Sequence, residues 1–221
     1  MVDLDVLPMT CCSHECFEST FNERHAAKQL KNYRRRGPEA TTRLLVDALR
    51  AEGVRDASLL DVGAGIGIVH HELLADGARS AVHVDASRPQ MRAAREEAAR
   101  RGHAERVTFV DGDFTQLADG IDDADIVTLD RVICCYPDME RLVAASASKA
   151  KRLYGAVFPR ERWAVKAMSA LGNLMWRIRG NPFRSYIHST TAIDAAVRRQ
   201  GLTLRSAVDT LVWRVAVYAR G

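Results

Sequence analysis

The chain has 221 residues, which is enough for one domain with a sizeable core and short for two independent domains. Hydrophobic residues make up 47% of the chain and charged residues 27%, which excludes a disordered or fibrous protein, and a net charge of +4 is too weak for a dedicated nucleic-acid binder. No apolar run approaches the roughly 18 residues of a spanning helix, and the acidic start has no signal-peptide pattern, so we expect a soluble, cytoplasmic protein.

The N-terminal part of the chain is expected to contain an irregular, cysteine-containing tail over residues 1–20 and a helical cap over residues 21–51. The cap carries helix formers with apolar positions at helical spacing. Gly37-Pro38 interrupts this pattern, because proline cannot continue a helix and glycine favours its end. Two helices that meet at Gly37-Pro38 are therefore predicted.

From residue 57 onward, short apolar runs alternate with helical stretches. The expected strands are 59–62, 81–84, 107–110, 126–129 and 154–158, and the expected helices are 68–76, 88–101 and 139–147. This βα alternation is typical of a parallel sheet, and strands that read as continuous apolar runs indicate helices on both of its faces.

The C-terminal part departs from that alternation. A helix over 191–200 ends at Gly201, and two further strands follow at 202–208 and 211–219 with only Asp209-Thr210 between them. Such a short connection predicts an antiparallel hairpin. The fold class is therefore α/β, a Rossmann-like, mostly parallel seven-stranded sheet that ends in an antiparallel hairpin.

The strongest motif is the glycine-rich turn Asp61-Val62-Gly63-Ala64-Gly65-Ile66-Gly67, which lies between the first strand and the following helix. Glycines at alternate positions allow positive φ and a close approach of a ligand to the backbone. Asp61 would repel a pyrophosphate but can pair with the cationic amino group of a methionine moiety. The turn therefore favours S-adenosylmethionine (SAM) over a dinucleotide.

Acidic residues also follow the second and third strands. Asp85 offers two oxygens to the hydroxyls of a ribose, which indicates a nucleoside site. Met91 can underlie an adenine or simply pack in the core. Asp113 and Phe114 can accept from and stack near an adenine, whereas a simple β-turn over 111–113 is the alternative.

Four segments together resemble successive motifs of class I SAM-dependent methyltransferases of the small-molecule type. They are Asp61 to Gly67, Asp85-Ala86-Ser87, Gly112-Asp113-Phe114 and Ala124 to Asp130, and the resemblance covers roughly residues 30–219. It implies a SAM-dependent methyltransferase with a small-molecule, apolar acceptor. The cofactor contacts that it implies are Asp61, Gly63, Ala64, Gly65, Gly67, Asp85, Ala86, Met91, Asp113, Phe114, Asp130 and Arg131.

The acceptor side of the site is less defined by the sequence. Cys135 and Tyr136 follow the fourth strand, where the reacting groups of α/β proteins gather. Tyr33 and Arg36 are candidates because small-molecule members of the resembled family fold an N-terminal helix over the SAM site. His188 can act as a base, although a lone histidine is more often structural. No catalytic residue is assigned.

The cysteines raise an alternative function. Cys11, Cys12 and Cys16 stand with His14 within six residues and could bind zinc or arsenite, but the spacing is not a standard zinc pattern. The segment 132–138 is loosely similar to arsenite methyltransferases, but those enzymes carry a cysteine where this chain has Arg131. We expect no resident metal, and a tail with free thiols is the competing interpretation.

The insertion over residues 160–188 mixes large apolar residues with arginine and lysine, which is typical of an amphipathic helix. Phe158-Pro159-Arg160 resembles a turn of magnesium-protoporphyrin O-methyltransferases. We expect the insertion to form a core-facing lid. The alternatives are a wall of a hydrophobic acceptor pocket and a helix that contacts a membrane surface.

Two other functional classes remain open from the sequence. A nicotinamide-dependent oxidoreductase would need a glycine at position 68, where Ile68 stands. The other class is a SAM-binding protein without activity that acts through partners.

Overall fold

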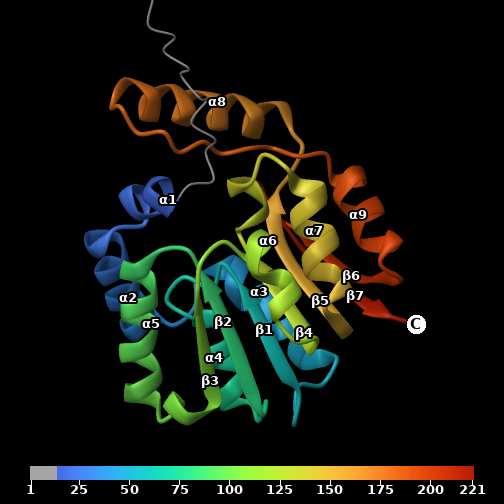
Figure 1. Ribbon diagram of the computed structural model, residues 1–221. Helices are drawn as coiled ribbons and strands as arrows, with labels where there is room; N and C mark the ends of the chain where they lie inside the picture. Colours follow the sequence, from blue (N-terminus) through green and yellow to red (C-terminus); the bar gives the residue numbers. More distant parts are fainter. Residues whose placement is uncertain (1–13) are drawn as a thin grey trace, which may run out of the picture.

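A seven-stranded sheet lies between two layers of helices in the computed structural model, which describes residues 14–221, with side chains from residue 17 (Figure 1). The strands are β1 (Ser58–Val62), β2 (Ser80–Asp85), β3 (Val107–Asp111), β4 (Ala124–Asp130), β5 (Ala150–Pro159), β6 (Leu202–Asp209) and β7 (Trp213–Arg220). Their spatial order is β3-β2-β1-β4-β5-β7-β6. Neighbouring pairs are parallel from β3 to β5, whereas β7 is antiparallel to both β5 and β6. The predicted fold class is confirmed.

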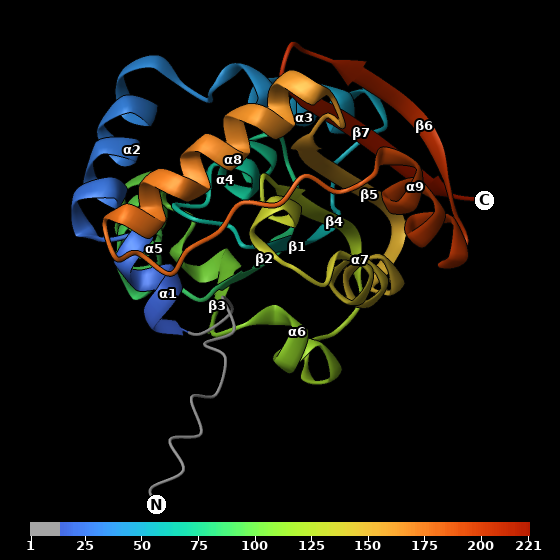
Figure 2. The ribbon, with the colours of Figure 1, turned by 90° about the horizontal axis from the view of Figure 1, so that it is seen from above.

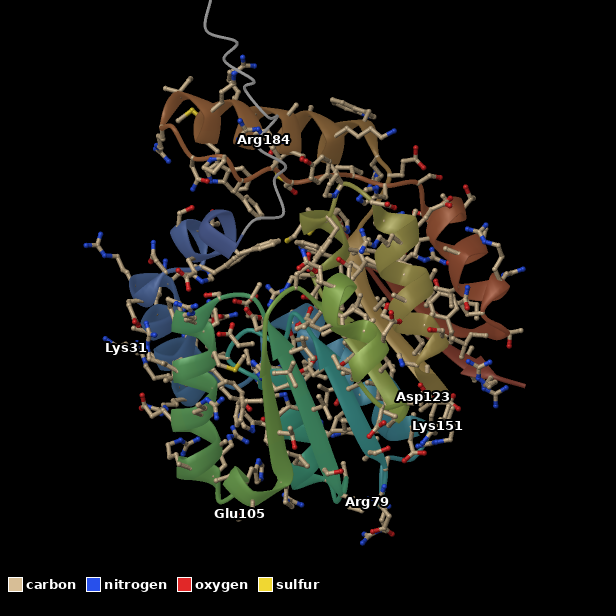
Figure 3. All side chains as sticks on the ribbon, in the orientation of Figure 1. Lys31, Arg79, Glu105, Asp123, Lys151 and Arg184 are labelled. Carbon is tan, nitrogen blue, oxygen red and sulfur yellow. The ribbon has the colours of Figure 1, made fainter. Side chains whose placement is uncertain are left out.

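The helices divide between the two faces of the sheet. They are α1 (His14–Thr20), α2 (Glu23–Arg36), α3 (Ala40–Ala51), α4 (Ile68–Ala75), α5 (Arg88–Arg101), α6 (Phe114–Leu117), α7 (Met139–Ser148), α8 (Trp163–Ile178) and α9 (Thr190–Arg199). One core joins α3 and α4 to the sheet, and a second core joins α7 and α9 to the opposite face. Charged side chains such as Lys31, Glu105 and Asp123 project from the outer surface (Figure 3).

Local sequence explains where several helices begin and end. The Asn22 side chain accepts a hydrogen bond from the backbone N–H of His25 and caps α2. Helix α2 ends at Gly37, as Gly37-Pro38 predicts, and α3 follows it. The connection between β6 and β7 comprises residues 210–212 rather than the expected pair Asp209-Thr210, because β6 extends through Asp209 and β7 begins only at Trp213.

The expected irregular tail over 1–20 is wrong for its last residues, which form helix α1. Phe17 of α1 is buried, and its ring lies 5.9 Å from that of Tyr136. This tertiary contact stabilises a helix too short to persist alone. Cys11 and Cys12 lie outside the described residues, and the side chain of Cys16 lies outside them as well.

The expectation of a core-facing lid over 160–188 is also wrong for most of helix α8. Seen from above, α8 crosses the molecule as its outermost layer (Figure 2). Val165 is the buried residue of this helix, while Trp163, Leu171 and Ile178 are 83%, 62% and 71% exposed. Across the part of the chain that the structure describes, α8 included, no helix combines the length and apolarity needed to cross a membrane.

Candidate functional site

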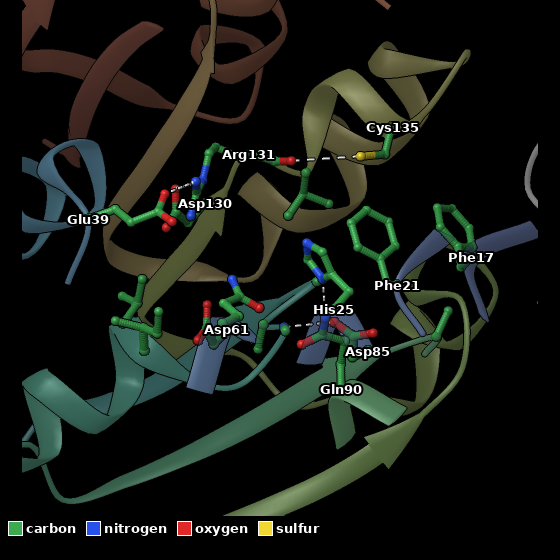
Figure 4. Close-up of a pocket in the computed structure, with 18 of the residues that line it drawn as sticks. Phe17, Phe21, His25, Glu39, Asp61, Asp85, Gln90, Asp130, Arg131 and Cys135 are labelled. Carbon is green, nitrogen blue, oxygen red and sulfur yellow. Dashed lines mark hydrogen bonds and ion pairs between the residues drawn. The ribbon is translucent and has the colours of Figure 1, made fainter. Parts of the chain in front are cut away.

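A cavity of about 470 Å³ opens at the carboxyl ends of β1, β2 and β4 (Figure 4). Its volume is in the usual range for small-molecule sites. Asp61, Asp85 and Asp130 come to it from these strands, and α1, α2 and the segment after β4 supply the other walls. Strand order reverses between β1 and β4, and this switch point is where open α/β sheets bind ligands.

The glycine-rich turn forms the floor of the cavity at Gly63, Ala64 and Gly65. Gly65 has φ of 58°, in the left-handed region that side chains rarely adopt. A Cβ there would point toward Gln90 Oε1, at 3.7 Å, and Gln29 Oε1, at 4.0 Å. Both amide oxygens are buried and accept no hydrogen bond from the described residues. The turn therefore leaves an open space beside two unsatisfied acceptors, which is called the polar cradle. Hydrogen-bond donors of a ligand can satisfy these acceptors.

Asp85 fixes the shape of this turn. Its Oδ2 accepts the backbone N–H of Gly65 at 2.7 Å, and its Oδ1 accepts that of Ser87 at 2.7 Å. Burial raises the pKa of Asp85 to about 6. Each carboxylate oxygen can accept a further hydrogen bond, so the remaining capacity suits the two hydroxyls of a ribose.

Asp61 is held from behind the turn. Its Oδ2 lies 2.9 Å from His70 Nδ1, and its Oδ1 accepts the Thr128 hydroxyl at 2.7 Å. All three side chains are buried. Because Asp61 also lines the cavity, these two partners fix a carboxyl group where the cationic end of a methionine moiety is expected.

His70 belongs to a cluster of four buried histidines behind the glycine turn: His70, His71, His83 and His103. The ring centroid of His70 lies 4.4 Å from that of His71 and 5.3 Å from that of His83. Burial lowers the pKa of His71 to about 2 and that of His83 well below its usual value. Burial also lowers the pKa of His103, so His71, His83 and His103 stay neutral near pH 7.

The end of β4 closes another side of the cavity. Asp130 Oδ2 accepts the hydroxyl of Thr42 at 2.6 Å, and burial raises the pKa of this carboxyl. Arg131 has a positive φ of 63°, and its guanidinium pairs with Asp130 at 3.3 Å and with Glu39. The left-handed backbone at Arg131 turns the chain sharply toward the next segment of the wall.

That segment forms an apolar wall with α1. Cys135, Tyr136 and Val132 line the cavity together with Phe17 and Phe21. These apolar side chains and the polar cradle line the same cavity, and the two sets of residues are called its apolar half and its polar half. The sequence-predicted candidates Cys135 and Tyr136 both lie in the apolar half.

The hydroxyl of Tyr136 is directed into the protein. It donates to Asp113 Oδ1 at 2.9 Å, while the same oxygen accepts from the backbone N–H of Thr115 at 2.9 Å. Asp113 is therefore the N-cap of α6 and an anchor for Tyr136. Neither Asp113 nor the buried Phe114 lines the cavity, although both were expected to contact adenine.

Several other expected site residues also lie away from the cavity lining. Met91 packs on the buried face of α5, and Gly67 caps α4 beneath the turn. Tyr33 donates its hydroxyl to Glu72 at 2.6 Å and does not line this cavity, where it was expected to contact the acceptor. Tyr33 and Arg36 both line a smaller cavity of about 260 Å³ beside the first.

His188 is held by the chain itself. Its Nε2 lies 2.8 Å from the carbonyl oxygen of Tyr136, and burial lowers its pKa. His188 does not line the cavity. The geometry gives it a structural contact behind the apolar wall rather than access to an acceptor.

The thiols that the structure describes are those of Cys134 and Cys135, which are both buried and form no disulfide. Their Sγ atoms lie 3.4 Å and 3.7 Å from the carbonyl oxygen of Arg131. Within residues 17–221, no three His, Cys, Asp or Glu side chains are arranged so that they could hold a metal ion together. The thiol cluster suggested by Cys11, Cys12 and Cys16 depends on side chains outside the described residues.

Some cavity residues had no clear signal in the sequence. Phe17 and Phe21 reach the site from a segment read as an irregular tail and its border. His25, Gln29 and Gln90 lie on exposed-looking helices, and α2 packs on α5 to bring them together. The polar face of α2 beside the apolar positions Ala26 and Leu30 was the one available hint.

Residues 59–152 match the family model described as a methyltransferase domain. No curated protein matches the sequence. Among solved structures, magnesium protoporphyrin IX methyltransferase from Synechocystis PCC 6803 with bound S-adenosylhomocysteine (SAH) has a TM-score of 0.72 and 18% identity, covering 94% of this chain and 98% of that chain. An O-methyltransferase family protein from Burkholderia thailandensis has a TM-score of 0.70 and 19% identity, covering 93% and 63%. A putative sarcosine dimethylglycine methyltransferase from Galdieria sulphuraria has a TM-score of 0.66 and 16% identity, covering 82% and 85%.

The chain has the fold of class I SAM-dependent methyltransferases, and its residues 59–152 match a methyltransferase domain. SAM is the cofactor of that class. The cavity fits SAM, because Gly65 leaves space beside the turn and Asp85 can accept further hydrogen bonds. The amide oxygens of Gln29 and Gln90 have no donor among the described residues, so a ligand can supply one.

Proposed function

We propose that this enzyme transfers a methyl group from SAM to a small, apolar organic acceptor held in the same cavity. The observation that carries the proposal is the division of that cavity into a polar half at Asp61, Gly65 and Asp85 and an apolar half at Phe17 and Cys135. Magnesium protoporphyrin IX and sarcosine appear in the names of two of the compared structures, which supports a small-molecule acceptor.

The polar half has the donor and acceptor pattern that SAM requires. Asp85 would accept the ribose hydroxyls, and Asp61, fixed by His70 and Thr128, would face the ammonium group. Bound SAM supplies an electrophilic methyl group on a sulfonium. The chain's own contribution is to fix the orientation of both reactants, which is the main source of rate in such a displacement.

The apolar half would hold the acceptor and keep water from it. Phe17 and Phe21 come from α1 and its connection to α2. The ring of Tyr136 packs beside the ring of Phe17. Asp113 holds the Tyr136 hydroxyl, so that ring cannot rotate freely into the cavity. The wall thus presents ring faces and a thiol rather than charge, which favours an apolar substrate.

The decisive experiment is transfer of labelled methyl groups from SAM to a fractionated cell extract. We expect label in a small-molecule fraction that partitions into organic solvent. A Gly65→Val variant serves as the control, because a branched side chain in the cradle blocks SAM and should abolish the label. Label confined to RNA or protein fractions would reject the proposal, and a complete absence of transfer with intact SAM binding would favour a non-catalytic SAM-binding protein.

The thiol-dependent alternative has its own outcome. Arsenite should be tested as acceptor in the presence of a small thiol, together with elemental analysis of protein purified without chelator. Formation of methylated arsenic would show that the acceptor is a metalloid rather than an organic molecule. A Cys134→Ser/Cys135→Ser variant would then show whether the two described thiols take part.

A further inference from the structure

Helix α8 turns an apolar stripe toward solvent. The large exposed side chains repeat at helical spacing, and they are Trp163, Met168, Leu171, Leu174, Met175 and Ile178. The other large apolar side chains exposed in residues 17–221 are Val208 and Leu211. Figure 3 shows the side chains of α8 projecting away from the body of the molecule. Contiguous apolar surface of this kind marks an interaction site.

The inner face of α8 is polar and is already used. Ser169 donates its hydroxyl to the carbonyl of Ser185 at 3.0 Å, and Asn173 exchanges two hydrogen bonds with the backbone of Ser185. Trp176 adds an edge contact to Phe183 at 4.8 Å. The helix is therefore fixed to the body largely through polar residues, with most of its apolar residues facing out, which is the reverse of an ordinary surface helix.

Positive charge is concentrated around this stripe. Residues 160–179 contain five basic residues, Arg160, Arg162, Lys166, Arg177 and Arg179, and one acidic residue, Glu161. The excess of four positive charges equals the net charge of the whole chain, so the rest of the chain is neutral on balance. Arg162, Lys166 and Arg177 are exposed.

The hairpin tip lies beside the start of α8. Arg160 donates its backbone N–H to the carbonyl of Val212 at 2.8 Å, and its guanidinium donates to the carbonyl of Thr210 at 2.7 Å. Leu211, which is 82% exposed, stands between these two anchored residues. These contacts hold the exposed Leu211 close to the start of α8.

We propose that the outer face of α8, with Leu211, is a docking surface for an anionic phospholipid bilayer. Exposed leucine, isoleucine and methionine would enter the boundary of the acyl chains, and Trp163 would sit at the headgroup level. Basic residues beside the stripe would pair with anionic headgroups. A second copy of the chain fits less well, because two faces of the same positive charge would repel one another.

Vesicle flotation tests the inference with the whole protein. At low salt we expect strong binding to vesicles containing 30 mol% phosphatidylglycerol in phosphatidylcholine, as a chosen composition, and at least roughly tenfold weaker binding to phosphatidylcholine alone. Added salt should release most of the bound protein. Absence of binding to the anionic vesicles, or equal binding to both kinds, would overturn the inference.

Two variants locate the surface. Trp163→Ser/Leu171→Ser/Ile178→Ser removes exposed apolar groups, and Arg162→Gln/Lys166→Gln/Arg177→Gln removes charge; each should lower vesicle binding at least roughly tenfold. The matched control is Arg24→Gln/Lys31→Gln/Arg35→Gln, which removes the same number of exposed charges from α2. All should keep the thermal midpoint and SAM affinity of the unaltered protein, because none of these residues lies in the SAM cavity.

The results separate the possible occupants of the face. Retained binding in both α8 variants would overturn the inference, as would an equal loss in the α2 control, which would indicate unspecific charge attraction. Light scattering supplies a further check. A dimer that disappears in the apolar variant, without vesicle binding by the unaltered protein, would assign the face to a second copy and contradict the proposal.

Discussion

His70 Nδ1 lies 2.9 Å from Asp61 Oδ2 in a buried contact behind the glycine turn, whereas neither ring nitrogen of the neighbouring His83 has a hydrogen-bond partner among the described residues. We predict opposite effects of the same substitution. His70→Leu leaves a buried carboxyl one donor short and should cost about 1 to 3 kcal/mol of unfolding free energy. His83→Leu removes two buried polar atoms without partners and should be neutral or stabilising.

Urea unfolding at pH 7.5 measures both variants against the unaltered protein. His70→Leu should also weaken SAM binding, because Asp61 loses one of the two groups that fix it. His83→Leu should bind SAM normally. An equal loss of stability in the two variants would show that the contact between His70 and Asp61 does not stabilise the fold.

Stability should fall as the solution becomes acidic. Burial holds the pKa of His71 at about 2 and that of His83 well below 6.5, so the folded protein cannot take up the protons that unfolded histidines bind below pH 6.5. Each such histidine removes about 1.4 kcal/mol of stability per pH unit below 6.5. Asp85 acts in the opposite direction below about pH 6, because its folded pKa is raised.

The His83→Leu variant isolates one of these contributions. Between pH 6.5 and 5, its stability should fall less steeply than that of the unaltered protein, by about 1.4 kcal/mol per pH unit. Urea unfolding at several pH values supplies the two slopes. Parallel slopes would mean that His83 gains its proton in the folded state.

SAM affinity should depend on the ionisation of Asp85. Its pKa near 6 makes the carboxylate scarce at pH 5.5, so SAM binding should weaken about fourfold between pH 7.5 and pH 5.5. Asp85→Asn should bind SAM at least roughly tenfold more weakly at pH 7.5 and show little dependence on pH. Calorimetry with SAM checks both expectations.

The control for Asp85 is Asp111→Asn. Asp111 pairs with Asp85 in the sheet register at the end of β3, but it is exposed and does not line the cavity. Its substitution should leave SAM affinity unchanged. A similar loss in both variants would point to general electrostatics rather than to ribose contacts.

Two glycines of the turn should respond differently to alanine. In Gly65→Ala, the nearest atom to the new Cβ lies at 3.7 Å, so the variant should fold, at a cost of about 1 kcal/mol of stability for its positive φ. It should lose SAM affinity, because the new methyl group occupies the polar cradle. Gly67→Ala would place a Cβ 2.4 Å from His70 Cε1 and should destabilise the fold severely. Thermal unfolding and SAM titration distinguish the two, and a stable Gly67→Ala variant would contradict the packing described.

The sheet and the polar floor of the site could be predicted because their signals are local. The strands read as apolar runs, and the glycines and Asp85 stand directly after β1 and β2, where topology brings strand ends together. The order of these segments also made the hairpin of β6 and β7 predictable, although not its three-residue connection.

The acceptor wall and the lid could not be predicted because they depend on tertiary contacts. Helix α1 exists through Phe17, which packs on a residue more than a hundred positions away. Helix α8 shows ordinary amphipathic periodicity, and the sequence does not reveal that Ser169 and Asn173 would take the inner face. Deletion of residues 1–18 should damage the cavity wall, since it removes Phe17.

Calorimetric titration with SAM, SAH and NAD is the most direct test of a SAM-dependent methyltransferase. The described site predicts micromolar affinity for SAM and for its demethylated product SAH, because Asp61 and the cradle at Gly65 suit a methionine moiety and Asp85 suits its ribose. NAD should bind far more weakly, since Asp61 faces the position of a pyrophosphate. Tighter binding of NAD than of SAM would contradict the account and favour a nicotinamide-dependent oxidoreductase.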